Sequence, residues 1–299
     1  MRTAFINKLT ELARKDPKIF LIVGDLGFSV VEKFAQEFPE RFLNIGVAEQ
    51  NMTGVAAGLA LSGFHPFTYS IGNFTTLRCF EQIRNDLCYH KLPVTVVSVG
   101  GGFSYGPLGA SHHATEDIGA LRTLPNLTIC APGDPSETGI CTEILSTLPS
   151  PSYLRLGKAG EKQVHEQGIN FNLGEALFIG SGDSEFICTT GNILAFAKEE
   201  SIRLKLNATL VSFPFIKPID KSALLKMKNA KKIITLEEHQ INCGLGSAIL
   251  EGFNDLREEG KLSAIPMIRR VAIKDKFSSQ AGSQKHLRDT TGLNLTDKF

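Results

Sequence analysis

Short apolar segments alternate with longer helical segments along the first half of this chain of 299 residues. The apolar segments end at Gly, Pro or Asp, as strands do, and they cover residues 19–25, 66–71, 93–100, 127–132 and 152–157. Parallel strands must be joined by crossover connections, which are usually helices. The alternation therefore predicts an α/β fold whose mainly parallel sheet is covered by helices on both faces.

One helix of this half is signalled by its first residues. Asp134 suits the N-cap, Pro135 suits the first helical position, and Glu137 follows the cap at the spacing of a capping box. We therefore expect a helix from residue 135 onward.

The second half repeats the alternation after a polar, Gly-containing connector at residues 158–184. Its expected elements are strands at 186–190, 206–213, 231–238 and 267–273, and helices near 192–201, 220–229 and 245–259. A domain boundary is expected within the connector. The sequence thus predicts two doubly wound α/β domains of unequal size, at residues 1–165 and 166–299.

Composition excludes several classes of protein. A net charge of +1 provides no basic surface for nucleic acid, and no apolar run approaches the length of a membrane span or of a signal sequence. The six cysteines show no CxxC spacing, so neither a disulfide framework nor a zinc site is indicated. We expect a soluble cytoplasmic protein without nucleic-acid or membrane partners and with no metal ligands of its own.

The segment "NIGVAEQNMTGVAAGLALSG" places a carboxylate, Glu49, at the start of an otherwise apolar, small-residue helix. We expect this helix at 47–62, with Gly63 after its end. Glu49 has two explanations: a charge favoured by the helix dipole or a capping box, or an acid–base group in poorly hydrated surroundings. The face with Gly54 and Gly58 lacks side-chain bulk, so another element can approach its backbone closely.

Several segments together carry a family resemblance. "RFLNIGVAEQNMTGVAAGLALSG", the expected helix "NFTTLRCFEQIRND", "KLPVTVVSVGGGFSYGPLGASHH" and "LRTLPNLTICAPGD" closely resemble the pyrimidine-binding domain of transketolase and 1-deoxyxylulose-5-phosphate synthase. "TLEEHQINCGLGSAI" resembles the small C-terminal domain of the same enzymes. The likeness covers nearly the whole chain in order, and it implies a thiamine diphosphate-dependent enzyme that transfers a two-carbon ketol unit from a ketose to an aldehyde.

The resemblance implies a role for Glu49. In this family the glutamate of the "AEQN" signature hydrogen-bonds N1′ of the cofactor's aminopyrimidine and favours the imino form that removes the thiazolium C2 proton. An aromatic side chain from the following helix lies flat against the same ring, and Phe74 is our first choice for it, with Phe80 second. From spacing alone, core packing is the favoured explanation for either phenylalanine.

The segment "GPLGASHHATED" resembles the family's "GPTHQ" and follows the third predicted strand of the first half. The resemblance places His112 against the substrate carbonyl or the adjacent hydroxyl, where an imidazole can exchange protons near neutral pH. His113 is a further candidate for substrate binding, although either histidine also suits a loop hydrogen bond or a helix cap. Arg155, or Lys158 just beyond it, approximates a phosphate-binding position, but a strand-end arginine equally suits an ion pair.

The sequence also departs from the family pattern. Leu108 replaces an acidic residue that commonly contacts the donor sugar, and glycines at 100–102 replace a phosphate-contacting histidine, so phosphosugar specificity is in doubt. The "GDG" motif of the diphosphate-binding domain has no counterpart: "GDL" at Gly24, "GDP" at Gly133 and "GDS" at Gly182 do not fit it.

By resemblance, the chain is therefore expected to be the C-terminal subunit of a split transketolase. A separate N-terminal subunit would hold the cofactor's diphosphate through Mg²⁺ or Ca²⁺, most simply in an α₂β₂ assembly. Two alternatives stay open: the β subunit of a 2-oxoacid dehydrogenase, and a non-catalytic assembly subunit. His239 and its Gly-rich turn suit either an anion site at a helix N-terminus or packing between domains, and we expect stability and subunit contact.

Overall fold

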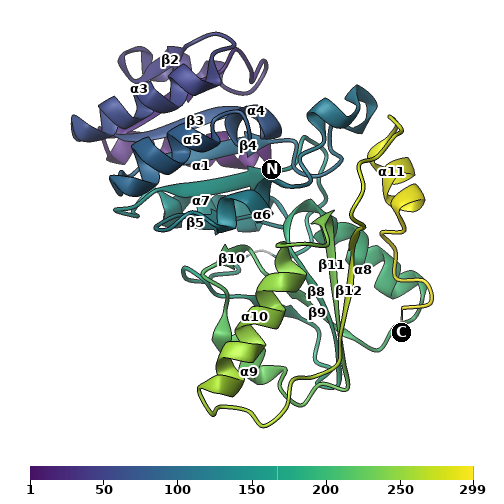
Figure 1. Ribbon diagram of the computed structural model, residues 1–299. Helices are drawn as coiled ribbons and strands as arrows, with labels where there is room; N and C mark the ends of the chain where they lie inside the picture. The colour runs from purple at the N-terminus through teal and green to yellow at the C-terminus, as the bar shows by residue number, and fades with distance from the viewer. Residues whose placement is uncertain (167, 299) are drawn as a thin grey trace.

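The computed structural model describes residues 1–166 and 168–298, and it contains two α/β units stacked one on the other (Figure 1). The predicted fold class of two mainly parallel α/β domains is confirmed. In the described part of the chain, no helix combines the length and the apolar character needed to cross a membrane.

The first sheet has the strand order β10-β5-β6-β4-β3-β1-β2, and all its pairs are parallel except β10 with β5. Each strand run predicted in the first half forms a strand of this sheet, and β2 is an addition that the sequence analysis missed. The strands are β1 (Ile19–Val23), β2 (Phe42–Asn44), β3 (His65–Ile71), β4 (Thr95–Val99), β5 (Thr128–Cys130) and β6 (Ser152–Leu156).

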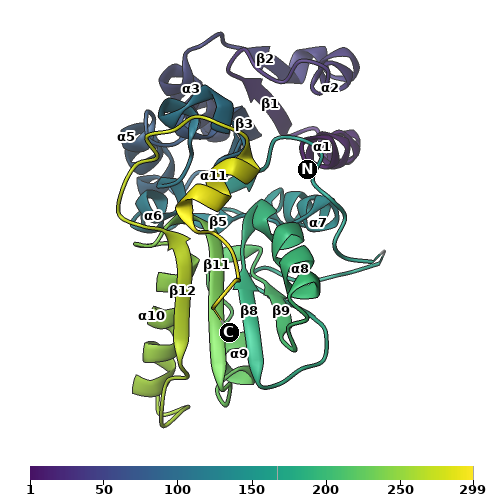
Figure 2. The ribbon, with the colours of Figure 1, turned by 90° about the vertical axis from the view of Figure 1, so that its right-hand side faces the viewer.

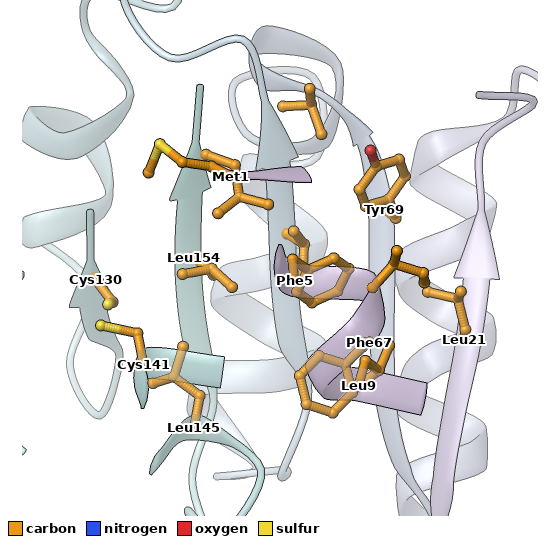
Figure 3. Packing of buried hydrophobic residues seen from close by; sticks show 14 of the residues in the cluster. Met1, Phe5, Leu9, Leu21, Phe67, Tyr69, Cys130, Cys141, Leu145 and Leu154 are labelled. Atoms are coloured by element: carbon orange, nitrogen blue, oxygen red, sulfur yellow. The ribbon is translucent and has the colours of Figure 1, made fainter. Parts of the chain in front are cut away.

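Helices cover both faces of this sheet, as predicted. On one face Phe5 of α1 stacks on Tyr69 of β3, with ring centroids 5.8 Å apart, and Leu145 of α7 belongs to the same core cluster (Figure 3). On the other face Met52 of α3 packs in a second cluster with Ile118 of α6. The longer helices of this half are α1 (Arg2–Lys15), α2 (Glu32–Glu37), α3 (Glu49–Leu61), α6 (Asp117–Arg122) and α7 (Pro135–Leu145).

Strand β10 (Phe215–Lys217) comes from the second half of the chain but pairs antiparallel with β5 of the first sheet. The Ala131 N–H also donates to the Pro214 carbonyl at 2.7 Å, which continues this pairing. The two halves are therefore joined by backbone hydrogen bonds, a feature that alternation along the sequence did not predict. The spans 1–165 and 166–299 stay a prediction for the domain limits.

The second sheet has the order β12-β11-β8-β9-β7, parallel except for β7 with β9. Helices α8 and α11 share a core cluster on one face, and α9 and α10 share another on the opposite face (Figure 2). The elements are β7 (Leu177–Ile179), β8 (Glu185–Thr189), β9 (Thr209–Ser212), β11 (Lys232–Gln240), β12 (Ile268–Ile273), α8 (Leu194–Arg203), α9 (Lys221–Lys226), α10 (Leu245–Glu258) and α11 (Gln284–Thr291).

The predicted cap at Asp134 is confirmed, and it also holds the connector. Asp134 Oδ1 accepts from the Glu137 N–H at 2.9 Å, while its Oδ2 accepts from the backbone N–H groups of Val164 and His165. His165 Nε2 lies 2.6 Å from Glu137 Oε1. Burial opposes a charged imidazole, but the hydrogen bond to Glu137 and the negative charges of Glu137 and Asp134 together outweigh it and raise the pKa of His165. This contact therefore stabilises the fold below the ordinary histidine pKa and weakens as pH rises through the raised value.

His65 gives stability the opposite dependence on pH. Its ring is buried and stacks on the Phe67 ring, with the two ring centroids 5.2 Å apart. Burial lowers the pKa of His65 from 6.5 to about 4. Between these values the unfolded chain binds a proton that the folded chain excludes, so stability falls as pH falls, by on the order of 3 kcal/mol in total. We expect His65→Gln to flatten this acid-side loss in urea unfolding measured across that pH range. His90→Gln, at an exposed histidine, should keep the wild-type slope, and an unchanged slope in His65→Gln would contradict the assignment.

Candidate functional site

Glu49 is the first residue of α3, and its carboxylate is buried, whereas most first-turn carboxylates lie in solvent. The side chain is 1% exposed; Oε1 accepts from Ser70 Oγ at 2.9 Å, and Oε2 accepts from Arg78 Nη1 at 2.8 Å. In the described structure no side-chain hydrogen bond caps α3 at Ala48, so the capping explanation does not account for this carboxylate. Glu49 instead joins α3 to the carboxyl end of β3 and to the turn after it.

The expected single helix "NFTTLRCFEQIRND" is wrong, because the chain breaks it. Helix α4 (Gly72–Thr75) ends in a turn at 76–79, and α5 (Phe80–Gln82) then leads into a π-helix at Ile83–Tyr89. The hydroxyls of Thr75 and Thr76 donate back to the Gly72 carbonyl at 3.2 and 2.7 Å, which favours ending the helix there.

The break separates the two candidate phenylalanines. The ring of Phe74 is half-buried and lies under the Arg78 guanidinium, whose carbon is 4.3 Å from the ring centre. Phe80 packs against the core cluster beneath α3. The structure thus brings Phe74, our first choice, to Glu49 through Arg78, whereas the position of Phe80 suits core packing. The cofactor roles of both residues stay predictions.

His112 reaches the same place from the loop after β4. Two 3₁₀ turns, Gly106–Leu108 and Ala110–His112, carry its half-buried ring, which meets Phe74 edge-on with centroids 5.2 Å apart. Asn73 Nδ2 fixes the loop by donating to the carbonyls of Ser111 and His113 at 3.2 and 2.8 Å. We call the group of Glu49, Ser70, Phe74, Arg78 and His112 the carboxylate site.

His113 lies below this site rather than in it. Its ring is buried, its Nε2 donates to the Gly106 carbonyl at 3.2 Å, and it contacts Phe103 edge-on. These contacts hold the loop that carries His112. The substrate role predicted for His113 stays a prediction, and its surroundings favour the alternative of a loop hydrogen bond.

Arg155 is buried in a network that connects three parts of the chain. Its Nε donates to Asp117 Oδ2 at 2.7 Å, and its Nη2 donates to the carbonyls of Ala114 and Glu238 at 2.6 and 3.1 Å. Tyr153 Oη also donates to Asp117 at 2.5 Å. These contacts fit the alternative explanation that Arg155 is an ion-pair partner. Substrate binding by Arg155 stays a prediction, and it would require Arg155 to break these hydrogen bonds.

The sequence "EEH" near the end of β11 supplies three side chains whose contacts hold elements together. Glu237 accepts from the first N–H groups of α10, those of Leu245 and Gly246, so this helix N-terminus already has its anion. Glu238 accepts from the Phe103 N–H of the first domain and pairs with Arg288. His239 Nε2 accepts from the Gly119 N–H of α6 at 3.1 Å. The contact of His239 therefore fits the alternative that this residue packs between the two domains, rather than an anion site.

Exposed apolar side chains lie in the segments that follow successive strands of the first sheet. Phe28 follows β1, Val47 follows β2, Leu77 follows β3 and Leu108 follows β4. Because carboxyl ends of parallel strands share one edge of a sheet, these side chains belong to the edge that carries the carboxylate site. We call these four residues the apolar rim.

Comparison with known proteins covers nearly the whole chain. Residues 1–160 match the family "Transketolase, pyrimidine binding domain", and residues 174–296 match "Transketolase, C-terminal domain". One of the subunits of the apulose-4-phosphate transketolase of Phocaeicola vulgatus is 35% identical, over 89% of this chain and 87% of the relative.

Two further matches are as extensive. The 6-deoxy-6-sulfo-D-fructose transketolase subunit SqwH of a Clostridium species is 31% identical, over 98% of this chain and 90% of the relative. A solved structure described as a split gene transketolase, inactive beta4 tetramer, superposes with a TM-score of 0.86 at 34% identity, over 99% of this chain and 94% of that one. The resemblance found in the sequence motifs is thus confirmed over both domains.

Proposed function

Because this chain belongs to the transketolase family, we propose that it is the pyrimidine-binding subunit of a two-chain, thiamine diphosphate-dependent transketolase. The reaction is transfer of a two-carbon ketol unit from a ketose to an aldehyde. The observation that carries the proposal is the buried carboxylate of Glu49, which Arg78 connects to Phe74 and Phe74 in turn to His112, at the ligand-binding edge of a parallel sheet.

The residues of the carboxylate site fit the pyrimidine half of thiamine diphosphate. Glu49 accepts two hydrogen bonds within the protein, and a carboxylate has about four acceptor positions, so it keeps capacity for a ligand. Gly24 leaves space beside it: a Cβ there would lie 3.1 Å from Ser70 Oγ and 3.4 Å from Glu49 Oε1. Phe74 offers an aromatic ring on which a flat heterocycle can stack.

When bound, thiamine diphosphate supplies the carbon nucleophile that carries the two-carbon unit between sugars. Glu49 holds the hydrogen at N1′ of the aminopyrimidine, and burial excludes water from that hydrogen bond. Phe74 orients the ring without adding charge. His112, half-buried at the mouth of the site, donates a proton to the oxygen of the substrate carbonyl and takes it back when the product forms.

A partner subunit supplies the diphosphate half of the site in this proposal, including Mg²⁺ or Ca²⁺. The apolar rim supports docking of another chain at the site's edge. Among the described residues, apart from the chain neighbours and the nearby backbone of α3 itself, no heavy atom lies within 4 Å of where a Cβ on Gly54 or Gly58 would sit, so that face of α3 is open to close contact. In a closed α₂β₂ assembly with two-fold symmetry, the apolar rim and this face of α3 would both be covered by neighbouring subunits.

The residues of the site say less about which sugars are the substrates than about the cofactor. The two similar subunits are named for different ketoses, one phosphorylated and one sulfonated. In this chain Leu108 is exposed at the loop that carries His112, and Nε and Nη2 of Arg155 donate to protein acceptors. We propose a polar ketose donor without assigning it a phosphate. Five of the six thiols are buried, which suits the reducing cytoplasm that we propose as its location.

Cofactor binding tests the two-chain arrangement. We expect isothermal calorimetry to show strong, Mg²⁺-dependent binding of thiamine diphosphate only when this chain is mixed with a partner that carries a diphosphate-binding domain. The mixture should then transfer ketol units from a panel of ketoses to aldehydes, with products identified by mass. Strong Mg²⁺-dependent binding by this chain alone would overturn the two-chain arrangement.

A further inference from the structure

The proposed function assigns two contacts to the cofactor's pyrimidine ring, one with the Glu49 carboxylate and one with the Phe74 ring. In this structure the guanidinium of Arg78 makes both of these contacts. Its Nη1 donates to Glu49 Oε2 at 2.8 Å, and its guanidinium lies 4.3 Å over the centre of the Phe74 ring. A guanidinium is planar and delocalised, so it can stack on an aromatic face and meet a carboxylate together. We infer that Arg78 is a plug that fills the pyrimidine half-site in the cofactor-free chain and leaves when the ring binds. This inference rests on the proposed function.

The exposures of the two partners show why Arg78, and not Glu49, is the group that moves. The Arg78 side chain is 43% exposed, whereas the Glu49 side chain is 1% exposed. Arg78 also lies in the turn at 76–79, between two short helices, so a rotation of its long side chain disturbs no regular element. Withdrawal returns the guanidinium to water, where a charged group is well solvated.

The buried carboxylate explains why such a plug is useful. An ionised carboxylate without partners is strongly disfavoured in a poorly hydrated place, so Glu49 needs a counter-ion while no ligand is bound. Ser70 provides one neutral hydrogen bond, and Arg78 provides the charge. The plug thus keeps the half-site formed in the free subunit, and ligand binding exchanges one set of partners for another.

The apparent affinity of the half-site for a pyrimidine ligand therefore depends on the fraction of time that the Arg78 side chain is out of the half-site. If the half-site is open about one-tenth of the time, the apparent dissociation constant is about tenfold above its intrinsic value. Because Arg78 is partly exposed, salt should weaken its pair with Glu49 and open the half-site more often. An uncharged ligand should therefore bind the wild-type chain more tightly as salt is added.

The fragment 4-amino-2-methylpyrimidine tests the plug on the isolated full-length chain. At mildly alkaline pH the ring is uncharged, and its 4-amino group supplies the hydrogen that the Glu49 carboxylate can accept. There we expect Arg78→Met to bind the fragment about tenfold more tightly than wild type in an NMR titration. Wild-type binding should tighten with added salt, whereas binding to Arg78→Met should not. Arg84→Met is the matched control, because Arg84 is exposed in the following π-helix and bonds to its neighbour Asn85.

The outcomes separate the plug from the function on which it rests. Unchanged or weaker fragment binding by Arg78→Met, or a wild-type affinity insensitive to salt, overturns the plug. Glu49→Ala should abolish fragment binding in both the wild-type and the Arg78→Met backgrounds. Binding that persists in both would overturn the pyrimidine contact of the proposed function. Binding that needs Glu49 but is the same with and without Arg78 overturns the plug alone.

Discussion

Replacing Glu49 with Gln is expected to lower the turnover of the assembled enzyme by about two to four orders of magnitude. Glutamine keeps the size of the side chain and can still accept from Ser70 or Arg78, so the fold should survive. It cannot take up or release the proton that a carboxylate exchanges with a ring nitrogen. The measurement is kcat for ketol transfer by the complex at saturating thiamine diphosphate.

Glu81→Gln is the matched control for this prediction. Glu81 is an exposed carboxylate in α5, close in sequence to Arg78 but outside the carboxylate site, and its replacement should leave kcat unchanged. Wild-type turnover by Glu49→Gln in the assembled complex would favour the alternative of a non-catalytic assembly subunit. Oxidative transfer to a lipoyl group, in place of ketol transfer, would favour a 2-oxoacid dehydrogenase.

Local signals predicted most of the elements because each signal acts within one helix or strand. The cap at Asp134 depends on a residue three positions away, and Gly63 has the positive φ of 93° expected just after a helix end. β10 could not be predicted in this way. Its three residues pair with β5, which lies far away in the sequence, and no periodicity within the segment indicates the sheet to which it belongs.

The sequence predicted which types of residue form the candidate site, but not which side chains contact them. The "AEQN" motif predicted Glu49 at the start of a helix, and the resemblance predicted His112 and an aromatic nearby. Arg78 was missed, because "NFTTLRCFEQIRND" has the apolar spacing of one helix and the hydroxyl bonds of Thr75 and Thr76 break it. A pair of adjacent β-branched threonines was the available signal for that break.

Arg155 shows how a strand-end cation can be confused with a ligand-binding one. Its contacts with Asp117, Ala114 and Glu238 join β6, α6, the segment after the His112 loop and the second domain. Burial opposes its charge, but Asp117 together with Tyr153 and Glu238 outweighs that effect and raises the pKa of Arg155. Because Arg155 is charged and buried at every accessible pH, the stability of this junction depends on its carboxylate partner.

Asp117→Ala is therefore expected to lower the free energy of unfolding of the first domain by about 3–5 kcal/mol, since it leaves Arg155 buried without its counter-ion. Urea titration followed by circular dichroism measures the loss, and Asp117→Asn, which keeps one acceptor, should lose less and should fold if Asp117→Ala does not. Lys162→Met breaks an exposed pair with Glu199 and should stay close to wild type. Asp117→Ala with wild-type stability would contradict this account, because it would mean that the buried arginine needs no partner and remains available to a substrate anion.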